Sequence, residues 1–403
     1  MSAPKGSSQI PRGFSFAAAH CGIRKRRLDL GLIVAERPAA AAGMFTRNRV
    51  QAAPVIVSRR HLAATKGRAR AVVVNSGNAN CATGAAGLAT ARKTAAALAR
   101  ELGCRPEEIL VCSTGVIGMA LPAEPIVGAL PAMVRSREAE TETFNGFAQA
   151  IMTTDTRRKQ ARATCQIAGR TVRLLGCAKG AGMIHPQLAT MLAFVLTDVA
   201  ARPTLLARAL ARAVARTFNS ISVDGDTSTN DTVLLLASGA ARARPLKSGS
   251  ADERRFAAAL EKVCGELALA IVADGEGAEH VIELEVRGAP SDAAARRVAE
   301  TIATSPLVKT ALAGADPNWG RILAAAGRAG VEFDQSRAAV WLAGRLVCRR
   351  GAPVPFKETS VHRRMLEKRV DLAIDLGAGS GRARMLTCDF TEEYVRINAS
   401  YRT

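Results

Sequence analysis

The chain is poor in the side chains on which several common kinds of site depend. Aromatic residues make up 4% of its 403 residues, and it holds five histidines. That aromatic content is too small for a stacking platform that binds single-stranded nucleic acid. The histidines form no H-E-x-x-H pair and the sequence has no G-x-S-x-G stretch, so zinc hydrolysis and a Ser-His-Asp hydrolase both lack their usual motif.

The nine cysteines are scattered, with no C-x-x-C pair and no metal-ligand spacing to a histidine. The pattern predicts reduced, buried thiols in a cytoplasmic protein and no metal site. The positions are Cys21, Cys81, Cys104, Cys112, Cys165, Cys177, Cys264, Cys348 and Cys388.

Long apolar runs are also missing, and none approaches the ~18 residues that a membrane span requires. Near the N-terminus the apolar patch FSFAAAHCG (14–22) precedes the basic cluster IRKRR (23–27), which reverses the order found in a secretory signal. Residues 1–28 contain no acidic side chain, a composition that resembles a transit peptide. We expect a protein without a membrane partner.

Basic side chains are abundant and give a formal net charge of +21. Such a charge is the usual electrostatic mark of a nucleic-acid binder. Here, however, most arginines are dispersed among alanines, as in ARALARAV, and only 23–27 and 157–159 form compact clusters. We expect a solvated basic surface and no nucleic-acid partner, and a non-enzymatic nucleic-acid-binding protein remains an alternative that rests on charge alone.

Apolar β-branched runs alternate with alanine-rich stretches, which predicts an α/β fold, and the length favours two domains. The stretch LGAGSGR (376–382) is predicted to be the turn of a hairpin rather than a dinucleotide-binding loop. The predicted strands are 32–36, 53–58, 71–77, 108–115, 171–180, 232–239 and 280–288. The predicted helices are 84–102, 124–135, 204–216, 252–270 and 292–303.

Polar stretches, most of them containing glycine, follow or precede many of the predicted strands. Loops at strand ends, carried on a rigid sheet, are where α/β proteins place substrate contacts. Because no cofactor motif accompanies them, they indicate an enzyme that works through side-chain hydroxyls and backbone N–H groups. The stretches are 74–84, 112–118, 151–156, 179–186, 224–231, 273–280 and 316–322.

Several of these stretches are similar to those of one known family. The sequence KGAGMIHPQLATMLAF (179–194), with VNSGNANCATG, STGVIG, IMTTDT, DGDTSTND, GEGA and NASYRT, resembles the ornithine acetyltransferases, also called bifunctional glutamate N-acetyltransferase/amino-acid acetyltransferases of arginine biosynthesis. The match is collinear from about residue 11 to 403 and leaves no room for a transit peptide. It implies an αββα sandwich with a catalytic domain at 1–280 and a smaller C-terminal α/β domain at 281–403.

The resemblance implies a chain that cuts itself between Ala189 and Thr190. Thr190 would then be the nucleophile, and its new α-amine, with an ordinary pKa near ~7.7–8.0, would serve as the base. In the ping-pong reaction of this family, N-acetylornithine gives its acetyl group to Thr190, ornithine leaves, and glutamate becomes N-acetylglutamate. No cofactor is implied, with acetyl-CoA as a co-substrate if the protein is bifunctional.

The resemblance also places roles on individual residues. Thr114 and Gly115 would form the oxyanion hole, with a hydroxyl and a backbone N–H as donors. Lys179 can pair with a substrate α-carboxylate and Glu276 can hold an ammonium group. The two cleaved chains would stay together, as a heterotetramer of two α and two β chains. The implied substrate-binding residues are Thr153, Lys179, Thr190, Glu276, Asn398 and Thr403.

Two features leave alternatives open. Glu279 stands where the family usually has a small or hydroxyl residue, so a second carboxylate follows Glu276 and is expected to compete for the ammonium group or alter substrate choice. Taken alone, Thr190 before an apolar run is a helix cap or core threonine. A related self-processing amidase or peptidase, in which water replaces glutamate as acceptor, is the alternative function.

Overall fold

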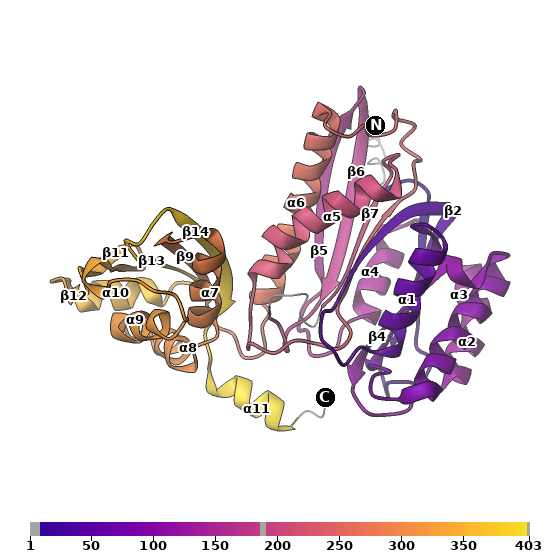
Figure 1. Cartoon of the computed structure of the whole chain (residues 1–403). Helices are drawn as coiled ribbons and strands as arrows, with labels where there is room; N and C mark the ends of the chain where they lie inside the picture. Colours follow the sequence, from indigo (N-terminus) through magenta and orange to yellow (C-terminus); the bar gives the residue numbers. More distant parts are fainter. Residues whose placement is uncertain (1–8, 186–190, 401–403) are drawn as a thin grey trace, which may run out of the picture.

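The computed structural model describes residues 9–185 and 191–400. The predicted cleavage pair Ala189–Thr190 and the predicted substrate contact Thr403 lie outside these residues. The described chain forms two β-sheets, one from β1 to β8 and one from β9 to β14, each with its own helices (Figure 1).

The first sheet is mixed, with parallel pairs β3–β4 and β7–β8 and antiparallel pairs elsewhere. The long strand β2 pairs with β1 and β3 through its first half and with β8 through its second half. The order is β4 (Ile109–Val116), β3 (Arg68–Asn78), β2 (Leu30–Phe45), β8 (Thr232–Ala237), β7 (Leu192–Thr197), β6 (Arg170–Lys179) and β5 (Lys159–Ile167), with β1 (Phe14–Ala19) beside β2.

Strand β2 shows how this sheet folds into two layers. Its side chains alternate between faces, as the period of two in a strand requires. Ile33 and Ala41, one in each half, belong to the apolar cluster that lies between the layers. Leu32 in the first half packs under one set of helices, whereas Ala40 in the second half packs under another. The exposed residues 36–38 separate the halves, so one continuous strand contributes to both layers.

Helices cover both outer faces, which completes the predicted αββα sandwich (Figure 1). Helix α4 packs against β1 and β2 and adds Phe147, whose ring lies 5.4 Å from that of Phe194, to the central cluster. The helices over β1–β4 are α1 (Ala53–Ala64), α2 (Gly84–Leu102) and α3 (Ala123–Ser136), those over β5–β8 are α5 (Pro203–Arg216) and α6 (Ala251–Val272), and α4 is Thr141–Ala150.

The second sheet buries one face against helices and leaves charged residues on the other. On strand β9, Ile282 and Leu284 belong to the core while Glu283 and Glu285 point away from it. The strand order is β12 (Ala352–Pro353), β11 (Arg345–Arg349), β10 (Ala339–Leu342), β13 (Arg369–Asp375), β9 (Val281–Ala289) and β14 (Gly381–Cys388). The helices are α7 (Asp292–Ala303), α8 (Pro306–Ala313), α9 (Trp319–Gly327) and α10 (Glu358–Met365), and α11 (Glu392–Ser400) follows the sheet.

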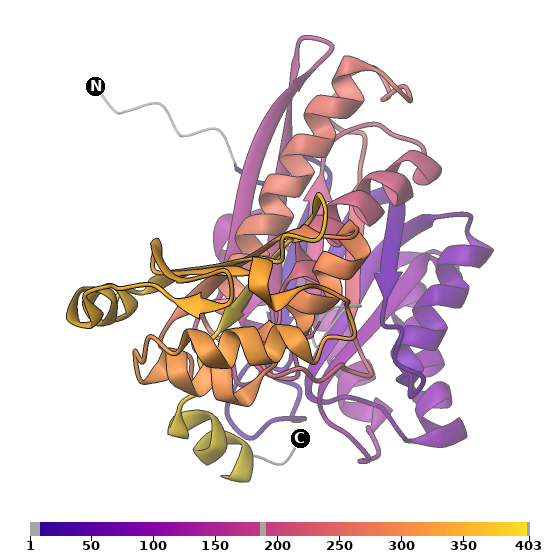
Figure 2. The ribbon, with the colours of Figure 1, turned by 60° about the vertical axis from the view of Figure 1, so that its left-hand side comes forward.

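Figures 1 and 2 place α11 at the end of the second sheet, on the side that faces the loops of the first. This position brings α11 into contact with loops more than 100 residues earlier, and Asn398 lines the same cavity as Lys179, which ends β6.

Two sequence predictions about individual elements are wrong. Residues 53–58, expected as a strand, begin helix α1, where Pro54 occupies the first turn and Ser58 Oγ accepts a hydrogen bond from Val111 N of β4 over 2.8 Å. Packing on β4 therefore overrides the β-branched composition. Strands β13 and β14, expected to form a hairpin, do not pair with each other; β9 lies between them, parallel to β13 and antiparallel to β14.

The strand predicted at 32–36 is present but much longer, as β2 continues to Phe45, and the other predicted strands and helices have bounds shifted by a few residues at most. All nine cysteines are free, as predicted; Cys21, Cys104 and Cys165 are half-buried and the remainder are buried. In the described part of the chain, no helix is both long and apolar enough to cross a membrane.

Candidate active site

Six of the seven polar stretches meet around one cavity of about 210 Å³. The seventh, 316–322, lies in the second part of the chain, where the Asn318 side chain caps α9 by accepting a hydrogen bond from Arg321 N over 3.2 Å. The predicted residues that line the cavity are Thr114, Gly115, Thr153, Lys179, Glu276 and Asn398. The structure thus brings together every predicted site residue that it describes.

The predicted oxyanion residues lie near the end of β4. Gly115 has φ of +132°, and a Cβ on it would lie 2.3 Å from the carbonyl carbon of Gly77 on β3. No larger residue fits there, because both the backbone angle and the neighbouring backbone exclude a side chain. Asn230 holds the surrounding backbone by donating hydrogen bonds to Ser113 O at 2.8 Å and Ala79 O at 2.7 Å. Sequence reasoning did not single out Asn230.

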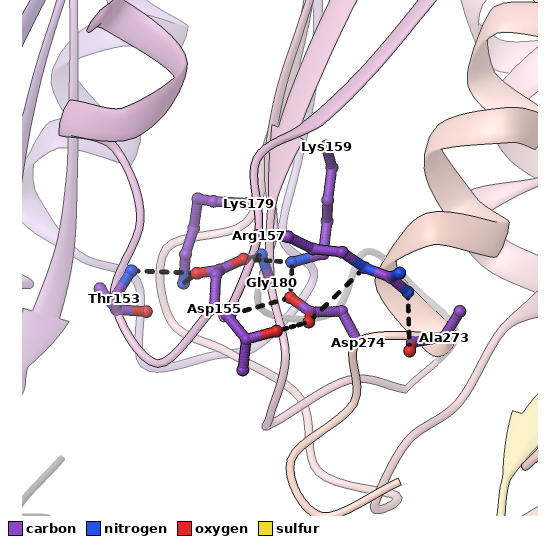
Figure 3. Close-up of polar contacts among 9 residues, drawn as sticks. Thr153, Asp155, Arg157, Lys159, Lys179, Gly180, Ala273 and Asp274 are labelled. Atoms are coloured by element: carbon purple, nitrogen blue, oxygen red, sulfur yellow. Dashed lines mark hydrogen bonds and ion pairs between the residues drawn. The ribbon is translucent and has the colours of Figure 1, made fainter. Parts of the chain in front are cut away.

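Five charged residues form a connected set next to the cavity, which we call the charge array: Arg157, Asp274, Lys159, Asp155 and Lys179 (Figure 3). Lys159 Nζ lies 2.6 Å from Asp155 Oδ1 and also contacts Asp274 Oδ2. Lys179 Nζ lies 4.0 Å from Asp155 Oδ2, and Arg157 Nε lies 3.7 Å from Asp274 Oδ1. Only Arg157 is well exposed.

Asp155 connects two predicted substrate contacts, Thr153 and Lys179. It accepts hydrogen bonds from Thr153 N at 2.9 Å and from Gly180 N at 2.7 Å. Burial opposes ionisation of Asp155, but Lys179, Lys159 and the Gly180 N–H outweigh it and lower its pKa to about 2. Burial lowers the pKa of Lys179, and Asp155 opposes that change. The array was missed because nothing in the sequence shows that these charges are buried together.

Glu276 faces the cavity and contacts the end of the chain. Asn398 Nδ2 of α11 donates a hydrogen bond to Glu276 Oε2 over 2.9 Å. A Cβ on Gly182 would lie 2.4 Å from the same oxygen, so the absence of a side chain at 182 leaves room for the carboxylate. Glu279, predicted to compete with Glu276, is exposed and does not line the cavity, since the chain turns away to form β9. Glu279 is therefore not placed beside Glu276 at the cavity, and its effect on substrate choice stays a prediction.

Two aspartates of the stretch 224–231 also belong to the site. Asp224 accepts hydrogen bonds from Met183 N at 2.5 Å and Ile184 N at 2.9 Å, and burial raises its pKa to about 6. Asp231 is fully buried, and its Oδ1 accepts a hydrogen bond from Met191 N over 2.9 Å. Its Oδ2 has no hydrogen-bond partner among the described residues, and burial raises its pKa well above the ordinary value.

The contact with Met191 places Asp231 one residue from the predicted nucleophile, because Met191 directly follows Thr190. The sequence drew attention to 224–231 as a whole, but it gave no sign of which carboxylate is buried. Within 9–185 and 191–400, no group of three or more His, Cys, Asp or Glu side chains is arranged to hold a metal ion.

The chain is similar to named proteins over nearly its whole length. The arginine biosynthesis bifunctional protein ArgJ of Lactococcus lactis is 45% identical over 98% of both chains. The protein of the same name from Gloeobacter violaceus is 46% identical over 99% of this chain and 98% of its own. A crystal structure of the protein of that name from Bacillus halodurans has a TM-score of 0.50 and 42% identity, and covers 52% of this chain and 98% of the solved one. Residues 15–403 match the ArgJ family, and the chain therefore belongs to the ArgJ family.

Proposed function

We propose that this protein is a self-processing N-acetyltransferase that moves the acetyl group of N-acetylornithine to glutamate in arginine biosynthesis. The observation that carries the proposal is the meeting of Thr114, Gly115, Thr153, Lys179 and Glu276 around one cavity in a chain of this family. Family membership favours the transferase over the amidase alternative, because the named relatives are arginine biosynthesis proteins.

The first step is cleavage at Ala189–Thr190. Thr190 Oγ attacks the Ala189 carbonyl, the C–N bond breaks, and the hydroxyl proton passes to the departing nitrogen, which leaves an ester. Water then hydrolyses the ester and frees the Ala189 carboxyl group, the Thr190 hydroxyl and its α-amine. Two hydrogen bonds support this step by fixing the residue after the bond: Met191 N donates to Asp231 Oδ1, and Met191 O accepts from Thr232 N at 3.0 Å.

The second step is acetyl transfer by way of acetyl-Thr190. The Thr190 α-amine takes the hydroxyl proton as Oγ attacks the acetyl carbonyl of N-acetylornithine, and ornithine leaves with that proton. Glutamate then attacks the acetyl ester through its neutral α-amine, the ester C–O bond breaks, and a proton from the attacking amine passes through the Thr190 α-amine to Oγ, which restores the hydroxyl and releases N-acetylglutamate. In both halves the oxyanion accepts hydrogen bonds from the Thr114 hydroxyl and the Gly115 N–H. Lys179 pairs with the substrate α-carboxylate, Glu276 with an ammonium group, and Thr153, Asn398 and Thr403 complete the contacts.

Cleavage leaves the two chains held together by the first sheet. Strand β6 ends at Lys179 and β7 begins at Leu192, on opposite sides of the cut, and the two pair antiparallel along their length. Residues 1–189 and 190–403 therefore remain associated, and two such pairs form the proposed heterotetramer. The Bacillus halodurans chain, matched over 98% of its length but covering 52% of this one, has the length expected of one product of a mid-chain cut.

The remaining parts of the proposal follow the family resemblance. The first sheet and its helices make up a catalytic domain at 1–280, and 281–403 a smaller domain that supplies α11. The enzyme acts in the cytoplasm without a cofactor, and acetyl-CoA serves as an additional acetyl donor if the protein is bifunctional.

The test is an acetyl-transfer assay on the purified protein. With N-acetylornithine and glutamate, ornithine and N-acetylglutamate should form in equal amounts. A parallel reaction, in which acetyl-CoA replaces N-acetylornithine as the acetyl donor, tests whether the protein is bifunctional. Release of acetate without N-acetylglutamate would instead favour the amidase, because water would then be the acceptor.

A further inference from the structure

The charge array alternates in sign from the surface to the cavity. Its order is Arg157, Asp274, Lys159, Asp155 and Lys179, and each neighbouring pair lies within 4.0 Å. Lys159 and Asp155 are fully buried, Asp274 and Lys179 are 3% exposed, and Arg157 is 57% exposed. Three cations and two anions leave one positive charge in excess.

The alternation in sign determines which cation of the array remains available to bind an anion. If Asp155 had Lys179 as its only cation, the pair would be neutral and would attract a further carboxylate weakly. Lys159 competes for Asp155 and lies closer to it, at 2.6 Å against 4.0 Å for Lys179. Lys179, which lines the cavity, is therefore only partly neutralised by Asp155. It can bind an anion in the cavity, and that anion would continue the alternation of charges.

We infer that the charge array is a positioning device for the proposed reaction: Asp155 orients Lys179 and Thr153 toward the substrate, and Lys159 prevents Asp155 from neutralising Lys179. The ligand at the cavity end is then the α-carboxylate that N-acetylornithine and glutamate share. Asp155, Lys159 and Asp274 act through Lys179 and Thr153 and do not themselves line the cavity. This inference rests on the proposed function.

The first test is a double-mutant cycle between Asp155 and Lys179. Asp155→Asn should raise KM for N-acetylornithine and for glutamate by about tenfold each, with kcat changed by less than about threefold, since Lys179 and Thr153 lose the carboxylate that orients them toward the substrate in both halves. In a Lys179→Met background the same change should raise KM by less than about twofold. Equal effects in the two backgrounds would overturn the inference, because Asp155 would then not act through Lys179.

The pH profile of Asp155→Asn distinguishes a positioning role from a purely structural one, because loss of a purely structural residue would leave the pH dependence of kcat/KM unchanged. Removing the Asp155 charge lowers the pKa of Lys179, on which Lys159, Glu276 and Asp231 also act. The alkaline limb of kcat/KM should therefore move to lower pH than in the wild type. An unmoved limb would count against the inference.

A second variant covers the case in which Asp155→Asn does not fold. The double change Lys159→Met with Asp274→Asn removes one cation and one anion, and exchanging a whole buried pair for neutral residues usually preserves folding. Asp155 is then left to Lys179, so KM for both substrates should rise about fivefold or more. The matched control is Asp198→Asn. Asp198 is a buried carboxylate that directly follows the C-terminal end of β7 and pairs with Arg173.

The control should keep the wild-type KM, and every variant is first checked for cleavage by intact mass. Wild-type KM in the double variant would contradict the inference. Failure of the proposed function would look different, since the wild type itself would then transfer no acetyl group.

Discussion

Asn398, in the last helix of the described chain, donates a hydrogen bond from Nδ2 to Glu276 Oε2 over 2.9 Å. Two further contacts hold this segment: Tyr394 OH of the helix lies 3.4 Å from Asp224 Oδ2, and Thr391 Oγ1, just before the helix, donates to Gly277 O at 2.6 Å. Residues close to a chain end usually fray unless such contacts hold them. The end of the chain is therefore a structural part of the cavity wall.

Changing Glu276 and Asn398 should affect substrate binding to different degrees. Glu276→Gln removes the charge for an ammonium group, so KM for N-acetylornithine should rise by about 10–100-fold. Asn398→Ala removes a neutral substrate contact and a hydrogen-bond partner of that carboxylate, and it should raise KM about two- to fivefold. Steady-state kinetics of the cleaved variants measure both, and an Asn398→Ala effect as large as that of Glu276→Gln would mean that Asn398 contacts the substrate more strongly than it supports Glu276.

Thr114→Val tests the oxyanion hole. The change keeps the shape of the buried side chain and removes the hydroxyl donor, so kcat should fall by about 10²–10³ with KM within about threefold. Thr114→Ser, which keeps the hydroxyl, is the control and should lose no more than about tenfold. If valine and serine at this position gave the same kcat, the Thr114 hydroxyl would have no role in stabilising the oxyanion.

Asp231 should be needed for its hydrogen bond rather than its charge. Burial raises the pKa of Asp231 well above the ordinary value, so a negative charge there is disfavoured, and Asp231→Asn can still accept from Met191 N. Asp231→Leu leaves that buried N–H unpaired, at a cost of about 1–3 kcal/mol. Mass spectra taken over time should show near wild-type cleavage for asparagine and at least tenfold slower cleavage for leucine; an uncut asparagine variant would show that the negative charge is required.

The pKa of about 6 at Asp224 predicts a pH-dependent stability. Since the folded protein binds this proton more tightly than the unfolded chain, the free energy of unfolding should fall as pH rises from about 4 to about 6, by about 2 kcal/mol. Urea unfolding of the uncut Thr190→Ala chain, with and without Asp224→Asn, measures this change. The asparagine chain should lack this part of the slope, and parallel profiles would contradict the assignment.

The sequence was most informative where a local pattern determines the structure. Helices 84–102 and 292–303 have the predicted bounds because apolar residues recur along them at three- and four-residue spacing. The loops of the site were found because polar stretches, most of them containing glycine, adjoin buried strands. The charge array could not be found in this way, because Lys159 and Asp274 are 115 residues apart and each, considered alone, is expected to be a charged residue on the surface. The strand predicted at 53–58 failed for the related reason that its partner, β4, is distant in sequence.

The most direct test of the account is the intact mass of the purified protein beside its Thr190→Ala variant. We predict two fragments from the wild type, 1–189 and 190–403, and one uncut chain from the variant, because Thr190 Oγ starts the cleavage that exposes its own α-amine. A folded wild type that remains a single chain would contradict the account, since the proposed nucleophile would then have no amine to activate it.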